Sequence, residues 1–131
     1  MKDITIGTVG TAETSATREQ LAVSMESGGL EVFATPAMIA LMEKAACHCV
    51  ADFLTDDETT VGTELNVKHV SATPEGMAVR AEAELIGVNG RQLTFSVKAF
   101  DERGLIGEGT HGRFVVYGKR FTEKAAAKLN K

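Results

Sequence analysis

The segment EVFATPAMIALMEKAACHCVADF, residues 31–53, predicts one long, mostly buried helix around which the rest of the chain folds. Thr35 is expected to cap its N-terminus, because a threonine hydroxyl accepts a hydrogen bond from a free amide of the first turn. Pro36 suits the first helical position, where no amide is needed. About eighteen helical residues would span about 27 Å, enough for the spine of a small domain. Apolar residues recur at helical spacing, namely Met38, Met42, Ala45, Cys49 and Phe53, with Ile39, Ala46 and Val50 beside them.

Glu43 interrupts the apolar side of this helix. The residues three, four and seven positions away on its face are all uncharged, so no cation of the helix is placed to pair with it. Burying an unpaired carboxylate is costly. Glu43 therefore either reaches water from the helix margin or meets a partner from elsewhere in the chain.

Composition indicates one soluble globular domain covering residues 1–131. Hydrophobic residues make up 44% of the chain and charged residues 24%, which is typical of a protein with a single core. The net charge is −4 without a basic run, which argues against a nucleic-acid partner. No apolar run is long enough for a signal peptide or a bilayer span, so no membrane partner is expected. Cys47 and Cys49 lie about 200° apart around the helix and cannot bridge, so we expect reduced thiols and a cytoplasmic protein.

Four strands are expected after the long helix. They are the alternating segments Thr59–Val70 and Met77–Val88, then the strand containing Leu93–Ala99, then Leu105–Tyr117. Asn89-Gly90 is a strong hairpin signal. A weak first strand within 4–14, a helical turn near Leu21 and a terminal helix at 121–129 complete the pattern. The fold class is α+β, a long central helix wrapped by a curved antiparallel sheet, with close helix–sheet approach at Ala81, Ala83, Gly107 and Gly109.

His69 is the second residue that could carry chemistry. It is in phase with Val61, Leu65 and Val67, so its ring is expected to face the helix. A satisfied core histidine is one interpretation of that placement. The other is acid–base chemistry with Glu43, and it predicts that the two side chains share a cavity, in contact or bridged by one water or ligand. On that interpretation, Glu43→Gln removes no salt bridge.

Arg113 shares a face of the last strand with Gly107, Gly109 and His111. The sequence alone favours a strand curved by glycine and bearing surface charges. No serine nucleophile elbow or phosphate-binding loop is present. The three histidines have no metal-ligand spacing, and the two cysteines are interpreted as core residues, so no metal is expected.

Six short runs together resemble the fluoroacetyl-CoA thioesterase-like branch of the hotdog-fold acyl-CoA thioesterases. They are VFATP (32–36), LME (41–43), VGT (61–63), VKH (67–69), ATP (72–74) and GEGTHGR (107–113), and the resemblance covers roughly residues 30–121. It implies a hotdog fold in which two subunits pair to complete the sites, hence a homodimer or higher homo-oligomer. The implied activity is hydrolysis of an acyl-CoA thioester, which needs neither a metal nor a redox cofactor.

The same resemblance implies roles for individual residues. Thr35, Glu43 and His69 match the family's catalytic residues, and Thr35 is expected to hold Glu43 or the substrate through its hydroxyl. Glu43 would act as general base or as nucleophile, and His69 would shuttle protons or polarise the thioester. Gly62 is expected to offer its backbone amide to the thioester carbonyl, and Arg113 lies near the site.

One segment departs from the family's pattern. Residues 24–29, SMESGG, contain no aromatic residue that could form a tight apolar lid. We therefore expect a small or medium acyl group, without selectivity for a fluorinated one.

Two alternatives remain at the level of sequence. A hotdog hydratase would need an Asp-x-x-x-x-His pattern, which is not apparent. A non-catalytic acyl-CoA-binding or regulatory module would bind its ligand without turnover, and its binding would survive Glu43→Gln.

Overall fold

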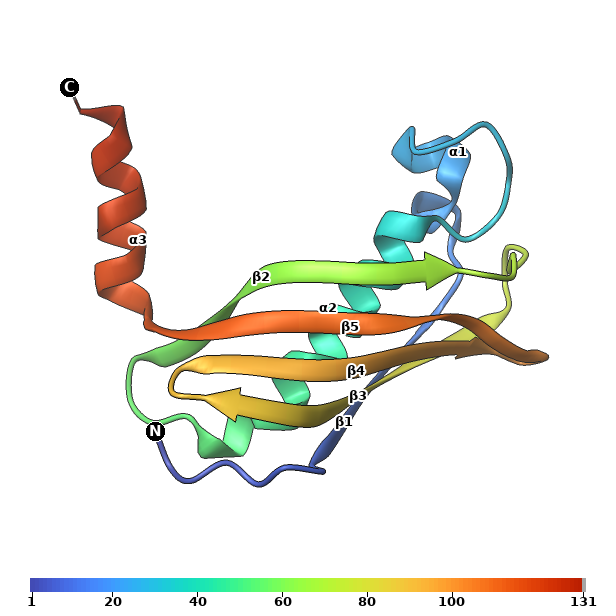
Figure 1. Cartoon of the computed structure of the whole chain (residues 1–131). Coiled ribbons are helices and arrows are strands. Elements are labelled where there is room, and N and C mark those ends of the chain that lie inside the picture. Colours follow the sequence, from blue (N-terminus) through green and yellow to red (C-terminus); the bar gives the residue numbers. More distant parts are fainter. Residues whose placement is uncertain (131) are drawn as a thin grey trace.

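The computed structural model describes residues 1–130 and consists of a long helix lying across an antiparallel sheet (Figure 1). The elements in chain order are β1 (Val9–Ser15), η1 (Arg18–Gln20), α1 (Ala22–Met25), α2 (Thr35–Val50), η2 (Ala51–Phe53), β2 (Glu58–His69), β3 (Ala78–Asn89), β4 (Gln92–Asp101), β5 (Gly104–Tyr117), α3 (Gly118–Ala126) and η3 (Ala127–Leu129). The long helix, the four later strands and the terminal helix are confirmed. The first strand begins later than predicted, at Val9.

The sheet has the order β1-β3-β4-β5-β2, with every neighbouring pair antiparallel. The β3–β4 hairpin turns at the predicted Asn89-Gly90, where Gly90 has a φ of 63°. That left-handed conformation is the one the turn requires and glycine adopts readily. β1 and β2 form the two edges, so β2 has one strand neighbour within the chain.

The core lies between α2 and the half of the sheet built from β1, β3 and β4. Ala81 and Ala83 are fully buried, as predicted, and Gly107 lies against the Met38 side chain. Among the glycines, Gly10 lies closest to the helix, because a Cβ there would overlap the α2 backbone at Ala45 and Cys49. The glycine predicted to admit the helix at position 109 instead faces the β2 backbone, so its small size serves strand pairing.

The start of α2 differs from the prediction. Ala34 is the N-cap residue and Thr35 is already helical, without a capping hydrogen bond from its side chain. The physical reason is competition for the hydroxyl, because Thr35 Oγ1 lies 2.8 Å from His69 Nδ1. The regular helix ends at Val50, and a 3-10 turn continues it through Phe53.

A bulge in β2 changes which of its side chains face the helix. Gly62 is opposite Arg113 and Glu64 is opposite Gly112, so Thr63 is an extra residue without a partner in β5. An extra residue reverses the alternation of faces beyond it. The predicted single face running from Val61 to His69 is therefore wrong. Gly62 faces α2 together with Val67 and His69, whereas Val61 points away.

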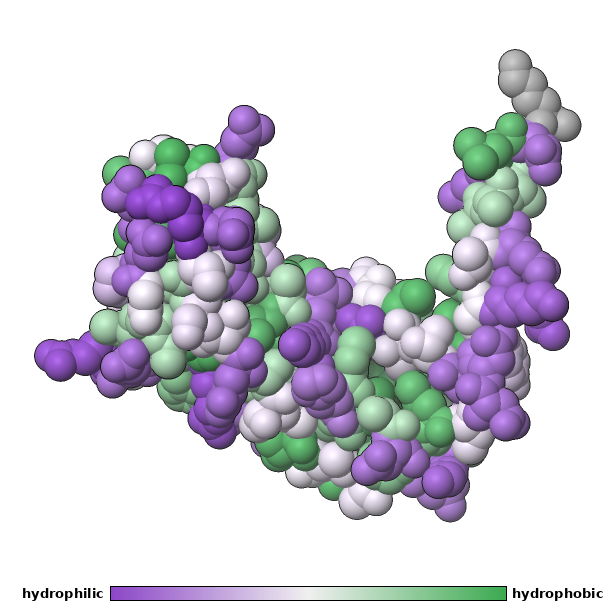
Figure 2. Space-filling model, turned by 180° about the vertical axis from the view of Figure 1, so that it is seen from behind, coloured by the Kyte–Doolittle hydropathy of each residue, from purple (hydrophilic) through white to green (hydrophobic). Residues whose placement is uncertain are grey.

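The β5–β2 half of the sheet is mostly left uncovered by the chain's own helix. Helix α3 projects beyond the β2 edge at one end, and the segment containing α1 projects at the other (Figure 1). The space-filling view shows the surface hollowed between these two projections (Figure 2). The floor of this hollow is the β2 edge.

Candidate active site

Glu43 is held by an arginine from the far end of the chain. Arg113 Nη1 donates to Glu43 Oε2 at 3.2 Å, and the two side chains are 8% and 37% exposed. Arg113 is itself fixed by Thr60, since Nε donates to the Thr60 hydroxyl at 2.9 Å and Nη2 to the Thr60 carbonyl at 3.1 Å. The interpretation of Arg113 as a surface charge is therefore wrong, as is the expectation that Glu43→Gln removes no salt bridge.

His111 completes this network from the same strand. Its Nδ1 lies 2.8 Å from the Glu64 carbonyl and its Nε2 3.1 Å from Arg113 Nη1. A carbonyl only accepts, so Nδ1 carries the proton and Nε2 accepts from the arginine. Burial lowers the pKa of His111; the Glu64 carbonyl partly opposes this, and the Arg113 charge lowers the pKa further. The ring is thus a neutral support for the guanidinium.

Sequence reasoning missed His111 and Thr60 as parts of the site. The signal for His111 was present, because it shares a face of β5 with Arg113 and two glycines. Thr60 had no such signal, because regular alternation along β2 would place it on the face opposite to His69, and the sequence does not reveal the bulge at Thr63 that reverses this.

Gly62 lies directly beside the Glu43 carboxylate. A Cβ at this position would stand 2.8 Å from Glu43 Oε2 and 3.4 Å from Arg113 Nη1. Any side chain would push the carboxylate aside, so the absence of one permits the Glu43–Arg113 geometry.

Thr35 and His69 form a second polar pair. Thr35 Oγ1 and His69 Nδ1 are 2.8 Å apart, and within residues 1–130 the buried His69 Nε2 has no hydrogen-bond partner. Burial lowers the pKa of His69 and so favours the neutral ring, and a hydrogen bond with the Ser71 backbone offsets part of this effect. A neutral imidazole at this distance can orient a hydroxyl or exchange a proton with it. The pair lines a hollow of about 310 Å³ with Ala22, Ser27, Val32, Phe33, Val70, Ser71 and Ala72.

The Glu43–Arg113 pair and the Thr35–His69 pair lie apart within one chain. Thr35 and Glu43 are eight residues apart on α2, about 12 Å at the helical rise. Gly62 and His69 are seven residues apart on β2, about 23 Å at the rise of a strand. Glu43 is bonded to Arg113 and His69 to Thr35, so the predicted direct contact of Glu43 with His69 is not made within one chain. Thr35 likewise holds His69 and not Glu43.

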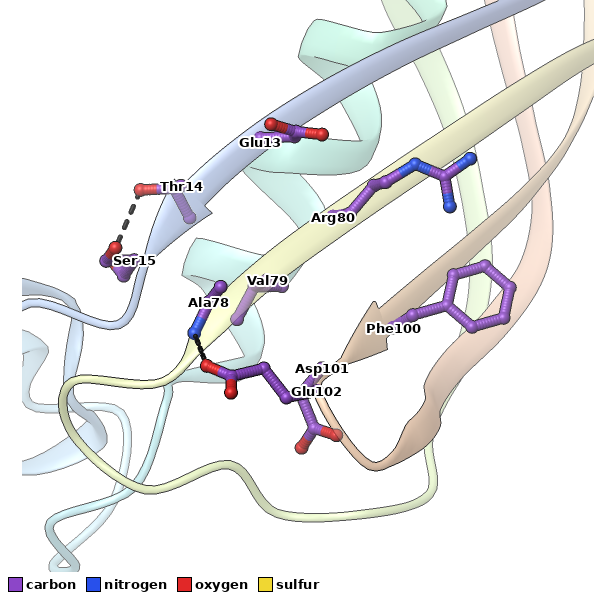
Figure 3. A pocket seen from close by; sticks show the side chains of 9 residues that line it. All are labelled: Glu13, Thr14, Ser15, Ala78, Val79, Arg80, Phe100, Asp101 and Glu102. Carbon is purple, nitrogen blue, oxygen red and sulfur yellow. Dashed lines mark hydrogen bonds between the residues drawn. The ribbon is translucent and has the colours of Figure 1, made fainter.

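A larger hollow, of about 520 Å³, lies elsewhere (Figure 3). Arg80 alternates with the buried Ala81, so this groove is on the face of the sheet away from α2. Arg80 pairs with Glu82, outside the groove, and lies 6.0 Å from the Phe100 ring centre, and Glu102 accepts a hydrogen bond from the Ala78 amide at 2.9 Å. Among the described residues that line the groove, no carboxylate lies beside a histidine or a fixed arginine, so we place the candidate site at Glu43 and His69.

The remaining polar candidates are structural. Cys47 and Cys49 are both free, and the Cys49 thiol donates to the Thr8 carbonyl at 3.1 Å. Burial raises the pKa of Cys49, so it stays a neutral core thiol. Within residues 1–130 no group of three or more histidine, cysteine or acidic side chains is placed to hold a metal ion. No helix of that same range is long and apolar enough to cross a bilayer.

A long helix wrapped by an antiparallel sheet is the hotdog fold, and the acyl-CoA thioesterases are one class of proteins with this fold. Within that class the chain belongs to the fluoroacetyl-CoA-specific thioesterase family, FlK, whose family model matches residues 16–119. The predicted resemblance, hotdog fold and thioester hydrolase class are thereby confirmed.

Individual relatives agree with this assignment. A fluoroacetyl-CoA thioesterase from Streptantibioticus cattleyicolor is 43% identical over 98 residues, which are 75% of this chain and 70% of the relative. A structure of the fluoroacetyl-CoA thioesterase FlK superposes with a TM-score of 0.91 at 33% identity, covering 97% of this chain and 98% of that one. A substituted form of FlK in complex with acetyl-CoA gives the same TM-score and identity, with 95% and 98% covered.

Proposed function

We propose that the protein hydrolyses a small or medium acyl-CoA to the free acid and CoA, with Glu43, His69 and Thr35 as its catalytic residues. The observation that carries this proposal is the Glu43 carboxylate, which is partly exposed, fixed by a buried arginine and faced by a glycine. A carboxylate positioned in this way is ready to act on water or on a thioester carbonyl.

The two polar pairs are proposed to meet between two copies of the chain. β2 is an edge strand, and edge strands offer unpaired backbone groups to a second strand. Antiparallel pairing of two β2 edges about a two-fold axis at Asn66, with the bulge at Thr63 counted as one extra residue, brings Gly62 of one copy opposite His69 of the other. Each composite site then contains Glu43 and Arg113 from one copy and Thr35 and His69 from its partner, which accounts for their separation within one chain.

Each group has a defined task in such a site. Glu43 activates water as general base or attacks the thioester carbonyl directly. The Gly62 amide, next to the bulge at Thr63, stabilises the oxyanion. His69, neutral and hydrogen-bonded to Thr35, polarises the thioester or passes a proton to the departing CoA thiolate. Single-turnover hydrolysis in heavy-oxygen water probes the routes, because an unlabelled first product shows that Glu43 formed an anhydride and that water then attacked its glutamyl carbon, which leaves a Glu43 oxygen in the product.

The acyl pocket is proposed to be open. Residues 24–29 are exposed and carry no aromatic side chain, and most residues around the Thr35–His69 hollow are small. The FlK relatives are described as fluoroacetyl-CoA-specific. Here we expect short and medium acyl groups to react at comparable rates.

The free cysteines support a cytoplasmic location.

A panel of acyl-CoAs, including acetyl-CoA and fluoroacetyl-CoA, tests the proposal through the release of free CoA thiol. We expect turnover of several short and medium chains by the wild-type protein and almost none by Glu43→Gln. Tight binding of acyl-CoA without turnover would instead support the non-catalytic module. A preference for fluoroacetyl-CoA over acetyl-CoA by orders of magnitude would contradict the open pocket.

A further inference from the structure

The charge of the chain is distributed unevenly. The last thirteen residues, KRFTEKAAAKLNK, hold five of the 14 basic residues but only one of the 18 acidic ones. Residues 1–118 therefore contain 9 basic and 17 acidic residues and form a strongly acidic body. A polyanionic substrate such as an acyl-CoA is repelled by such a body and attracted by a cationic end.

The base of α3 contains an ordered group of cations around an aromatic ring. The Arg91 guanidinium lies 4.7 Å from the Tyr117 ring centre, and its Nη2 donates to the tyrosine hydroxyl at 2.7 Å. The Arg120 guanidinium lies 5.5 Å from the same ring. Lys124 follows one helical turn later and lines the same hollow of about 310 Å³, which also includes Phe114, Val115, Val116 and Phe121.

These cations are available for a ligand. Among residues 1–130, Arg120 and Lys124 make no ion pair, so their charge is not taken up by a carboxylate of the chain. Glu58 is the carboxylate nearest to Arg91, at 3.7 Å, and it also pairs with the N-terminal ammonium at 2.9 Å. Its negative charge is therefore already matched.

The position of the cluster relative to Glu43 is also informative. Tyr117 is four residues beyond Arg113 on β5, about 13 Å along the strand, and alternation sets the two on the same face of the sheet. A long flexible substrate whose thioester lies at Glu43 can reach this distance with its other end.

From this geometry we infer that Arg91, Tyr117, Arg120 and Lys124 bind the phosphorylated adenosine end of the acyl-CoA. The inference rests on the proposed acyl-CoA thioesterase function. The adenine ring packs against the aromatic side chains of the hollow, Phe114, Tyr117 and Phe121. Arg120 and Lys124 pair with phosphate oxygens through charge-assisted hydrogen bonds. The cluster thus fixes the non-reacting end of the substrate and contributes to its binding, without touching the thioester.

The first test separates the nucleotide end of the substrate from its acyl end. Arg120→Glu with Lys124→Glu should raise KM for an acyl-CoA at least about tenfold, the loss expected when charged hydrogen bonds to phosphate are removed. kcat should stay unchanged. Turnover of the matching acyl-pantetheine thioester, which has no nucleotide, should be the same in wild type and variant. The control, Lys98→Glu with Arg103→Glu, reverses two exposed cations away from α3 and should leave KM within about twofold.

The second test does not depend on catalysis. Calorimetric titration with adenosine 3′,5′-bisphosphate should show binding to the wild-type protein that is lost in the α3 double variant and weakened by salt. An equal KM for acyl-CoA in wild type and α3 variant, or equal binding of the bisphosphate, overturns the inference. So does loss of binding to anionic lipid vesicles in the α3 variant with acyl-CoA kinetics unchanged, since α3 would then be a membrane-binding helix. Bisphosphate binding without any thioester hydrolysis would contradict the proposed function and leave the nucleotide site standing.

Discussion

At the scale of single residues, the site depends on one buried guanidinium. Arg113 uses Nε and Nη2 on Thr60 and Nη1 on His111 and Glu43, so each hydrogen bond restricts the position of the next. The Glu43 carboxylate therefore has a fixed oxygen while its other side remains open to solvent. This combination of fixation and access is what a general base or nucleophile needs.

The sequence could predict part of this arrangement. Glu43 and His69 were found because a carboxylate without a helical partner and a histidine in phase with apolar residues are both unusual. The pairing itself was not predictable, because Arg113 lies 70 residues from Glu43 and the bulge at Thr63 shifts the β2 faces. The resemblance supplied Thr35, whereas the capping preference of threonine predicted the wrong partner for its hydroxyl.

Replacing Glu43 with glutamine tests the role of its carboxylate. We expect kcat to fall at least about 10²-fold, because glutamine keeps the volume but loses the basic oxygen. The free energy of unfolding should fall by less than about 1 kcal/mol, because the bridge to Arg113 is partly solvent-screened on the glutamate side. Steady-state kinetics and chemical denaturation measure the two quantities. Glu108→Gln, on the exposed side of β5, is the matched control, and an equal kcat in both variants would rule out catalysis by Glu43.

Acid should weaken both activity and stability through the buried His111 and the half-buried His69. Burial lowers the pKa of His69 and His111 below the ordinary value of 6.5, so both are neutral in the folded protein near neutral pH. The unfolded chain binds these protons more readily, so the free energy of unfolding should fall as pH drops below about 6.5. The acid limb of kcat/KM should likewise lie below about pH 6.5, where His69 becomes protonated. Denaturation of wild type and His111→Gln across this range checks the sign, and identical slopes would contradict it.

At the scale of elements, the contact between α2 and the sheet sets the position of every site residue. α2 carries Thr35 and Glu43 two turns apart, while β2 and β5 supply the groups that face them. The pattern of apolar residues predicted these elements and their order well, because periodicity reflects burial. It missed the close contact at Gly10, because a glycine in a weak first strand gives no apolar signal.

Gly10→Ala should therefore destabilise the fold. An added Cβ would overlap the α2 backbone at Ala45 and Cys49, and backbone cannot move aside as a flexible side chain can. We expect a loss of about 1–3 kcal/mol, typical of an overpacked core, with a lower melting temperature. Gly29→Ala is the control, because a Cβ there meets nothing within 4 Å. Equal melting temperatures for the two variants would show that α2 does not lie as close to β1 as described.

At the scale of the whole molecule, the chain exposes the β2 edge of its sheet, which a second copy would cover. The β2 edge lies between two projections, and the site residues form two groups that one chain keeps apart (Figures 1 and 2). The sequence predicted an oligomer only through resemblance, because alternation within a strand does not reveal which strand ends at an edge. The separation of Glu43 from His69 is the structural reason to expect that each site needs two copies.

Mixing two inactive variants tests this composite site most directly. Glu43→Gln and His69→Ala are each expected to be nearly inactive, and light scattering must first show species larger than the 13.9 kDa chain. After the two are unfolded together and refolded, mixed dimers should contain one site built from an intact Glu43 and the partner's intact His69. About a quarter of the wild-type activity per site should return, the share expected for random pairing in a two-fold dimer. If the mixture stays as inactive as either variant alone, each site is built within one chain and the composite arrangement is wrong.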